Sequence, residues 1–295
     1  MSGQKIKKDV REFYNQVGWQ LVDQEHYQNA CYEDLRPVAS EYIHRCHMRV
    51  NRHLTPKGKY LLDAGSGPVQ YPEYLTYSSG YQARVCMDIS IQALVDARHR
   101  LKTHGFYVVG DIAHLPFKSN NFDGIVSLHT IHHIPMEEKL NAYEGLFRTL
   151  KPGRNFVVVE GWTNARLMKR LSGIMSYIRR FRGWWERNIL KQNHNTVERN
   201  SRIEVQHEDK LIEDSSPIGT FVKKVDADML DELLNGKMAY KILVWRSVSV
   251  EFLRTVIHQD WGGRFWLKLL FWLEERFPKY FGRNGQYPLI VISKE

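Results

Sequence analysis

The stretch Tyr60-Leu-Leu-Asp-Ala-Gly-Ser-Gly-Pro68 decides the fold of this chain. Its apolar start is typical of a buried strand in a parallel sheet. Gly65 and Gly67 allow the backbone to turn tightly and to approach a ligand closely, because they carry no Cβ. Pro68 suits the first position of a following helix, where its missing N–H is not needed. The pattern therefore predicts a strand, a glycine turn and a helix N-terminus that form a nucleotide-sized site at the carboxyl edge of a sheet.

The spacing of glycines and acids narrows the choice of ligand. The chain has no G-x-x-x-x-G-K-[ST] phosphate loop, and a dinucleotide fingerprint fails because Gln70 stands at the third glycine position. Asp63 precedes the turn, where it is better placed to meet a cation than a pyrophosphate. Asp88 ends the next apolar segment, 21 residues after Gly67, a spacing at which a carboxylate accepts hydrogen bonds from ribose hydroxyls. Asp111 follows a third such segment and suits an adenine edge.

Five ordered motifs resemble the class I S-adenosylmethionine-dependent methyltransferases, in particular the group that contains quinone and small-molecule methyltransferases. They are LLDAGSGP at 61–68, MDIS at 87–90, GDIAHLPF at 110–117, NFDGIVSLHTIHHI at 121–134 and LKPGR at 150–154. The resemblance covers about Tyr60 to Glu160. Two departures are Val69, where the family usually has a third glycine, and Arg154, where it usually has a glycine.

The resemblance implies S-adenosylmethionine as the cofactor and S-adenosylhomocysteine as its product. The residues implied in cofactor binding are Tyr14, Asp63, Ala64, Gly65, Ser66, Gly67, Asp88, Ile89, Asp111, Ile112, Ser127 and Leu128. His129 is the first side chain after the fourth strand that could face the acceptor, and a neutral imidazole there could take a proton from a hydroxyl. His133 is a second candidate base, although the family's double histidine also fits a supporting or capping role for both His132 and His133.

The predicted fold is α/β, with a Rossmann-like, mostly parallel seven-stranded sheet, helices on both faces and a helical cap insertion. Strands are expected near 59–64, 83–88, 105–109, 122–127, 155–160, 242–249 and 287–293, the last antiparallel. Helices are expected near 5–17, 36–54, 69–77, 91–102 and 137–149.

Four regions follow from this pattern. They are residues 1–58, N-terminal helices over the cofactor site; 59–160, the cofactor-binding core; 161–240, an inserted cap; and 241–295, the last two strands with an apolar helical insertion at 258–284.

Composition limits the environment and the partners. Three cysteines without a C-x-x-C pair favour a reducing, cytoplasmic compartment. The polar N-terminus is unlike a secretory signal, and no run of about 18 apolar residues is long enough to span a bilayer. No metal is expected, because His44 and His47 have no third ligand at a suitable spacing. The net charge of +9 favours an acidic partner.

The positive charge is concentrated in the cap. Residues 163–191 carry eight basic residues and one acidic residue, interleaved with apolar residues at helical spacing. This pattern fits either a membrane-surface helix or a core-packed helix with a solvated basic face. A second apolar segment, 261–281, could join it in one wall beside the active site and bring the protein to an anionic membrane surface. Residues 195–216 are polar and predict a loosely packed excursion.

These observations predict a methyltransferase that acts on an oxygen, in preference to a nitrogen or a carbon, of a small or lipid-linked acceptor. The basic charge leaves an RNA methyltransferase as an alternative, although no appended RNA-binding motif accompanies it and nucleic acid is the less favoured partner. A cofactor-binding but non-catalytic partner subunit is a third hypothesis.

Overall fold

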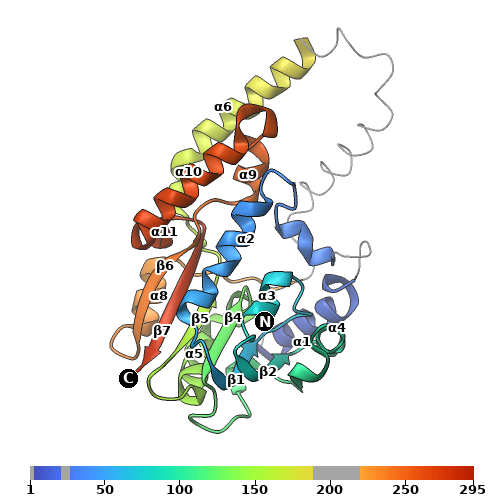
Figure 1. The fold of residues 1–295 in the computed structure, drawn as a ribbon, viewed down its shortest axis with the longest axis vertical. Helices are drawn as coiled ribbons and strands as arrows, with labels where there is room; N and C mark the ends of the chain where they lie inside the picture. The colour runs from blue at the N-terminus through green and yellow to red at the C-terminus, as the bar shows by residue number, and fades with distance from the viewer. Residues whose placement is uncertain (1–2, 21–26, 189–219) are drawn as a thin grey trace.

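The computed structural model describes residues 3–20, 27–188 and 220–295 (Figure 1). Its centre is a seven-stranded sheet in the order β3-β2-β1-β4-β5-β7-β6. The strands are β1 Gly58–Ala64, β2 Tyr81–Asp88, β3 Gly105–Val109, β4 Gly124–Leu128, β5 Arg154–Val159, β6 Ala239–Arg246 and β7 Tyr287–Lys294. Neighbouring strands among β1 to β5 are parallel, and β7 is antiparallel to both β5 and β6. The predicted fold class is therefore confirmed.

Helices connect and cover these strands. They are α1 Gly3–Phe13, α2 Ser40–Met48, α3 Pro72–Thr76, α4 Ile91–Leu101, α5 Met136–Thr149, α6 Arg166–Asn188, α8 Ala227–Leu234, α9 Val250–Val256, α10 Gly263–Arg276 and α11 Pro278–Asn284. Shorter turns are η1 Tyr14–Gly18 (a π-helix) and the 3₁₀ turns η2 Gln28–Tyr32, η3 Val50–His53, η4 Lys102–His104, η5 Ile112–His114, η6 Ile131–His133 and η8 Gln259–Trp261.

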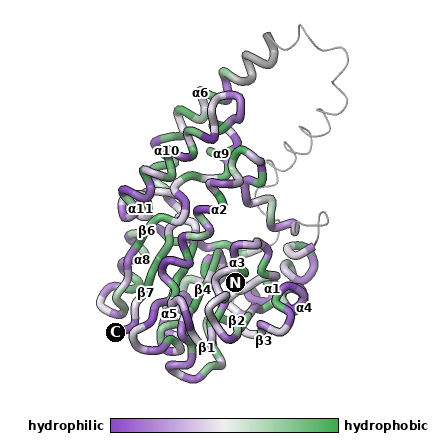
Figure 2. The backbone as a smooth tube through the Cα atoms, viewed as in Figure 1, coloured by the Kyte–Doolittle hydropathy of each residue, from purple (hydrophilic) through white to green (hydrophobic). Residues whose placement is uncertain are grey.

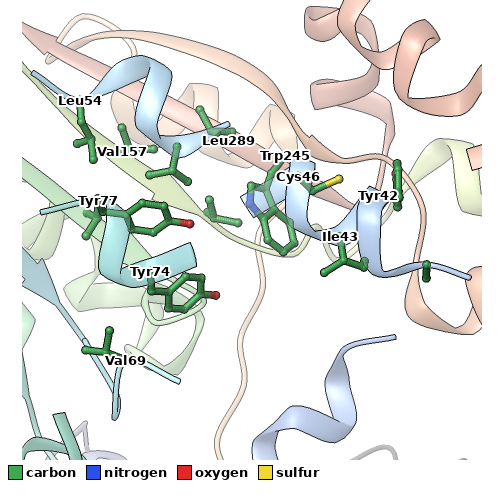
Figure 3. Close-up of a cluster of buried hydrophobic side chains, with 14 of the residues drawn as sticks. Tyr42, Ile43, Cys46, Leu54, Val69, Tyr74, Tyr77, Val157, Trp245 and Leu289 are labelled. Atoms are coloured by element: carbon green, nitrogen blue, oxygen red, sulfur yellow. The ribbon is translucent and has the colours of Figure 1, made fainter. Parts of the chain in front are cut away.

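Strict alternation along the strands places apolar side chains on both faces of the sheet. Leu61 packs into one buried cluster with α2, α3, α4, α9 and α10. Its neighbour Leu62 packs into the other cluster, with α5 and α8. Figure 3 shows part of the first cluster, with Trp245 beside Cys46 of α2 and Tyr74 beside Tyr77. Each face thus has its own core, as expected for a sheet covered on both sides.

Several boundaries differ from the sequence prediction. Helix α3 starts at Pro72 instead of residue 69, so Pro72 and not Pro68 occupies its first turn. The reason is Val69, whose φ of +55° is left-handed and cannot begin a helix. Strand β6 lies three residues earlier than predicted, because Ser249 caps α9 by accepting a hydrogen bond from the Phe252 N–H.

Two expected helices also differ. The one at 5–17 is an α-helix only as far as Phe13 and continues as the π-helix η1. The one at 36–54 is the shorter α2 followed by the 3₁₀ turn η3. The predicted excursion at 195–216 lies outside the described residues.

Candidate functional site

A cavity lies at the carboxyl ends of β1, β2 and β4, and α1 and η1 line it from the other side. It contains about 1020 Å³ of space not filled by atoms, part of it open to solvent. Most of the predicted site residues line it, namely Tyr14, Asp63, Gly65, Ser66, Gly67, Asp88, Ile89, Asp111, Ile112, Leu128, His129 and His133. Ala64 and Ser127 do not line it. They are fully buried, and the Ser127 hydroxyl donates a hydrogen bond to the Ala64 carbonyl, which ties β4 to β1 below the cavity.

The glycine turn needs its glycines. Gly65 and Gly67 have φ values of +77° and +53°, in the left-handed region that other residues rarely adopt. A Cβ on Gly65 would overlap Thr130, and one on Gly67 would lie 2.9 Å from the Trp19 ring. The turn therefore brings bare backbone to the floor of the cavity.

Asp88 connects the glycine turn to the next loop. Its Oδ2 accepts from the Gly67 N–H at 2.9 Å and its Oδ1 accepts from the Ser90 N–H at 2.8 Å. Burial raises the pKa of this carboxyl to about 6, against the opposing effect of its backbone hydrogen bonds. A buried carboxylate with spare lone pairs is suited to accept from hydroxyl groups of a ligand.

Asp63 pairs with a cation of the protein itself and not with a ligand. Arg84 of β2 forms a buried ion pair with it, and the Arg84 guanidinium also donates to the Tyr74 carbonyl at 2.5 Å. The cation suggested by the position of Asp63 is thus supplied within the protein. Its carboxylate holds the end of β1 and borders the cavity.

Asp111 binds the N-terminal helix. Its Oδ2 accepts from the Lys7 ammonium at 2.5 Å, and Lys7 also pairs with Glu138 of α5. Asp111, His114 and Glu138 lie close enough together to hold a metal ion, but the Lys7 ammonium already pairs with both acids. The cluster therefore serves to fasten α1 across the sheet edge.

His129 stands in a left-handed conformation, with φ +54°, immediately after β4. Its ring packs edge-on against Trp245 and Tyr287, at centroid distances of 5.2 and 5.8 Å. Burial lowers the pKa of its imidazole to about 3, so the ring is neutral at pH 7. The residue lines the cavity with an aromatic wall behind it.

His133 forms a hydrogen-bonded pair with Tyr14. Its Nδ1 lies 2.8 Å from the Phe221 carbonyl oxygen, which can only accept, so Nδ1 carries the proton. Its Nε2 then accepts from the Tyr14 hydroxyl at 2.8 Å. Burial, together with the neighbouring His132, lowers the pKa of His133 to about 3. The Tyr14 hydroxyl and a neutral imidazole therefore meet at the wall of the cavity.

Glu160 organises the loop that carries these histidines. Its carboxylate accepts from the Thr130 and Ile131 backbone N–H groups at 3.1 and 2.9 Å, and its Oε2 lies 2.7 Å from Nδ1 of His132. Burial would raise the pKa of Glu160, but the charge and hydrogen bond of His132 lower it to about 2. His132 thus supports the loop. Sequence reasoning missed Glu160, although an acid at the end of the fifth strand was a usable signal.

Two further cavity residues have polar atoms without a partner in the described part of the chain. The Trp19 Nε1 and Gln70 Oε1 atoms are buried without a hydrogen-bond partner among the described residues, and both side chains line the cavity. Trp19 stacks on Tyr14 at a centroid distance of 5.2 Å. Buried polar atoms without partners are costly, so these two suit a polar ligand.

Comparison with known proteins agrees with this geometry. Residues 62–158 match the family model described as a methyltransferase domain. A ubiquinone/menaquinone biosynthesis C-methyltransferase UbiE of Haemophilus ducreyi is 28% identical over 139 residues, which are 44% of this chain and 53% of the relative. The sterol 24-C-methyltransferase erg6 of Schizosaccharomyces pombe is 29% identical over 113 residues, 35% of this chain and 28% of the relative. The chain thus spans about half, or less, of the length of these relatives.

A solved structure shows the same fold across almost the whole chain. The geranyl diphosphate C-methyltransferase of Streptomyces coelicolor A3(2) superposes with a TM-score of 0.53, 13% sequence identity and 98% coverage of both chains. The glycine turn and Asp88, the acid that ends β2, both lie within residues 62–158, the part of the chain that the family model matches. Residues 62–158 therefore belong to a domain of the class I S-adenosylmethionine-dependent methyltransferases.

Proposed function

We propose that this protein transfers a methyl group from S-adenosylmethionine to an electron-rich carbon of a small or lipid-like acceptor. One observation carries the proposal. A single cavity holds a bare glycine turn, the buried carboxylate of Asp88 and two neutral imidazoles. The first two features fit a nucleoside ligand, and the imidazoles supply proton acceptors beside it.

The residues of the cavity fit the cofactor. Thr130 and Trp19 leave no space for a Cβ at Gly65 or Gly67, and both glycines line the cavity, so a ligand there would lie against the backbone of the turn. Asp88 would accept from the ribose hydroxyls, and the backbone around Asp111 would meet the adenine. The unpartnered Trp19 Nε1 and Gln70 Oε1 would find polar partners. When bound, the sulfonium supplies an electrophilic methyl group whose broken S–C electron pair stays on sulfur.

The weak basicity of the imidazoles argues for carbon as the accepting atom. A base with a pKa near 3 cannot hold the proton of an alcohol, so it gives little help to attack by a hydroxyl oxygen. It can take the proton from a carbon that has just gained a methyl group and carries positive charge. In that step the acceptor gives the electron pair for the new C–C bond, and its C–H proton passes to His129, or to the Tyr14 hydroxyl as that hydroxyl gives its own proton to Nε2 of His133.

The names of the matched relatives support the same choice, because both are carbon methyltransferases. The preference for oxygen that the sequence suggested thus becomes the alternative. The sulfonium itself needs only positioning and exclusion of water, which Tyr14, Trp19 and the aromatic wall of Trp245 and Tyr287 would provide.

The experiment is a transfer assay with S-adenosylmethionine labelled in its methyl group. The purified protein is incubated with a reduced menaquinone precursor that lacks its ring methyl group, a sterol unmethylated at C24, catechol, or total RNA. Label in the product of either of the first two supports carbon methylation. Label in catechol alone would replace carbon by oxygen, and label in RNA alone would replace the acceptor class altogether.

A binding measurement separates the cofactor from the reaction. We expect S-adenosylhomocysteine to bind in calorimetry. Binding without transfer to any acceptor would favour the non-catalytic partner subunit, whereas absence of binding would overturn the proposal itself.

A further inference from the structure

Helix α10 presents apolar side chains on two opposite sides. On its inner side Leu267 and Phe271 are buried against α2, and the Phe271 ring packs edge-on against Tyr42. On its outer side Phe265 is 64% exposed and Trp272 is 59% exposed. A helix with apolar side chains on two opposite sides normally has protein or lipid against both of them. The outer side therefore lacks the environment that its residues favour.

The exposed apolar side chains continue beyond the helix on both sides. Together they form what we call the α10 apolar face, whose other members are Trp261, Trp266, Leu269, Phe277 and Tyr280. Single exposed apolar residues are ordinary, but several of them on one helix and on the turn and helix that flank it are typical of a binding surface. None of these residues is among those that line the cavity at the glycine turn.

The charge around this face is positive. Arg264, Arg276 and Lys279 have no ion pair within the part of the chain that the structure describes. Lys268 lies 3.9 Å from Glu41. Arginines pair with both acids of α10, since Glu274 is fully buried against Arg49, and the exposed Glu275 pairs with Arg49 and Arg52. Free cations thus surround the aromatic rings.

Helix α6 has the same character. Its Ile174 and Tyr177 are exposed, and Lys169 and Arg180 are exposed beside them. Arg170 reaches the Tyr280 hydroxyl at 3.5 Å, which links α6 to the α10 apolar face. Figure 1 shows α6 and α10 extending beyond the end of the sheet, and Figure 2 shows apolar residues along both of them. The two helices thus offer a combined surface away from the core.

We propose that the α10 apolar face docks on the surface of an anionic lipid bilayer. Tryptophan and tyrosine favour the boundary between headgroups and acyl chains, because their rings are apolar and their tips are polar. Unpaired arginines and lysines beside them would bind anionic headgroups. Among the described residues no helix is long and apolar enough to cross a membrane, so the helices would lie in the plane of the surface.

A lipid surface fits these residues better than a protein partner does. Aromatic side chains and free cations alternate along α10, and the exposed acid Asp260 lies at the border of the face beside Trp261, whereas a protein interface of this type would need an acidic partner with matching pockets. The inference does not depend on methyl transfer. It adds a location from which the proposed reaction could reach a lipid-like acceptor.

The test is sedimentation of the purified full chain with vesicles. Vesicles of phosphatidylcholine with about one third phosphatidylglycerol should retain the protein at low salt, and retention should weaken as salt rises, because charge attraction is screened over roughly 8 Å at physiological ionic strength. Pure phosphatidylcholine should retain much less. Wild-type protein that ignores anionic vesicles at low salt would overturn the proposal and leave the face to a protein partner.

Matched variants assign the binding to the α10 apolar face. The double variant Phe265→Ser with Trp272→Ser should bind vesicles about tenfold or more weakly, and Arg264→Glu with Arg276→Glu at least about fivefold more weakly. The control is Phe106→Ser on the edge strand β3, which removes an aromatic ring that is 56% exposed. Equal loss in the control, or full binding by both double variants, would overturn the proposal. Circular dichroism and S-adenosylhomocysteine binding check that each variant is folded.

Discussion

A single carboxylate, that of Asp88, connects two loops at the cavity. It is held by the Gly67 and Ser90 backbone N–H groups, and its pKa is raised to about 6 because it is buried. Ribose hydroxyls would donate to its ionised form. Protonation would remove lone pairs from this interaction. Cofactor binding should therefore depend on pH near 6, which is above the range in which ordinary aspartates titrate.

We therefore expect S-adenosylhomocysteine affinity to fall by about tenfold between pH 7 and pH 5, the limit for a ligand that needs the ionised form of a group with a pKa near 6. Asp88→Asn keeps the shape of the side chain but cannot ionise. It should bind the ligand more weakly at pH 7, by roughly 5- to 150-fold, and without this pH dependence. Calorimetry at several pH values measures both effects. A variant as pH-dependent as the wild type would exclude Asp88 as the titrating group.

The left-handed conformation of His129 gives a second prediction for a single residue. A side chain at φ +54° costs roughly 1–2 kcal/mol, and glycine avoids this cost. Hence His129→Gly should unfold with a free energy about 1 kcal/mol higher than His129→Ala, the reverse of the usual order. Thr130, with φ −118°, is the control, since there the glycine variant should be the less stable. Urea unfolding measures the stability of the glycine and alanine variants at both positions. A His129→Ala variant more stable than His129→Gly would contradict a strained backbone at residue 129.

The π-helix η1 is the element that closes the cavity. Such turns are rare and concentrate at functional sites. It carries Tyr14 to His133, while Asn15 lies 2.7 Å from the Ser90 hydroxyl beyond Asp88. Gly18 ends the turn and is buried, and a Cβ added there would lie 2.5 Å from the Tyr14 ring. The position of Tyr14 therefore depends on the absence of a side chain at residue 18.

We expect Gly18→Ala to displace Tyr14 and so to weaken S-adenosylhomocysteine binding and lower the melting temperature. Gly173→Ala on α6 is the matched control, because nothing lies within 4 Å of its added Cβ. It should leave ligand affinity unchanged and stabilise the helix by up to about 1 kcal/mol. Calorimetry and thermal unfolding of both variants test this. Equal ligand affinity of the two variants would mean that η1 does not shape the site.

Elements with local signals were predictable from the sequence. The glycine turn, the acids at the strand ends and the alternation of strands and helices gave the sheet and most of the cavity. The start of α3 was not predictable from Pro68, because Val69 has a left-handed backbone that no local pattern announces. The role of Asp63 was also open until β1 and β2 paired, since its cation, Arg84, comes from the neighbouring strand.

The arrangement of the whole molecule was less accessible, because it rests on pairs far apart in the chain. Tyr14 and His133 are 119 positions apart, and Glu33 and Arg246 are 213 positions apart. Neither pair leaves a periodic trace in the sequence. The expectation that segments 163–191 and 261–281 form a wall of the active site was also wrong for the described residues, because none of these lines the cavity. The chain carries α10 past the sheet and packs its inner side on α2 instead.

Buried ionisable groups distributed over the molecule determine how its stability depends on pH. His129 and His133 have pKa values lowered to about 3, below the ordinary 6.5, because burial disfavours their charged forms. In the unfolded chain they take up protons first. Their contribution to stability is therefore complete above pH 6.5 and is lost as the pH falls toward 3. Asp88 acts in the opposite sense, because its raised pKa adds stability as the pH falls from about 6 to 3.8.

The net result is a protein that loses stability in mild acid. One group titrating fully changes the free energy of unfolding by about 1.4 kcal/mol per pH unit, so two histidines against one aspartate should give a slope of up to about that size between pH 6 and 5. Glu33 and Glu160, whose pKa values are lowered to about 2, add to the loss of stability as the pH falls further. Urea unfolding of the wild type at pH 7, 6 and 5 measures the slope. His129→Gln should flatten it and Asp88→Asn should steepen it, whereas His99→Gln, on the exposed side of α4, should leave it unchanged. If His129→Gln keeps the wild-type slope, the imidazole beside Trp245 is not held neutral by burial, and its proposed role as a weak base loses its physical ground.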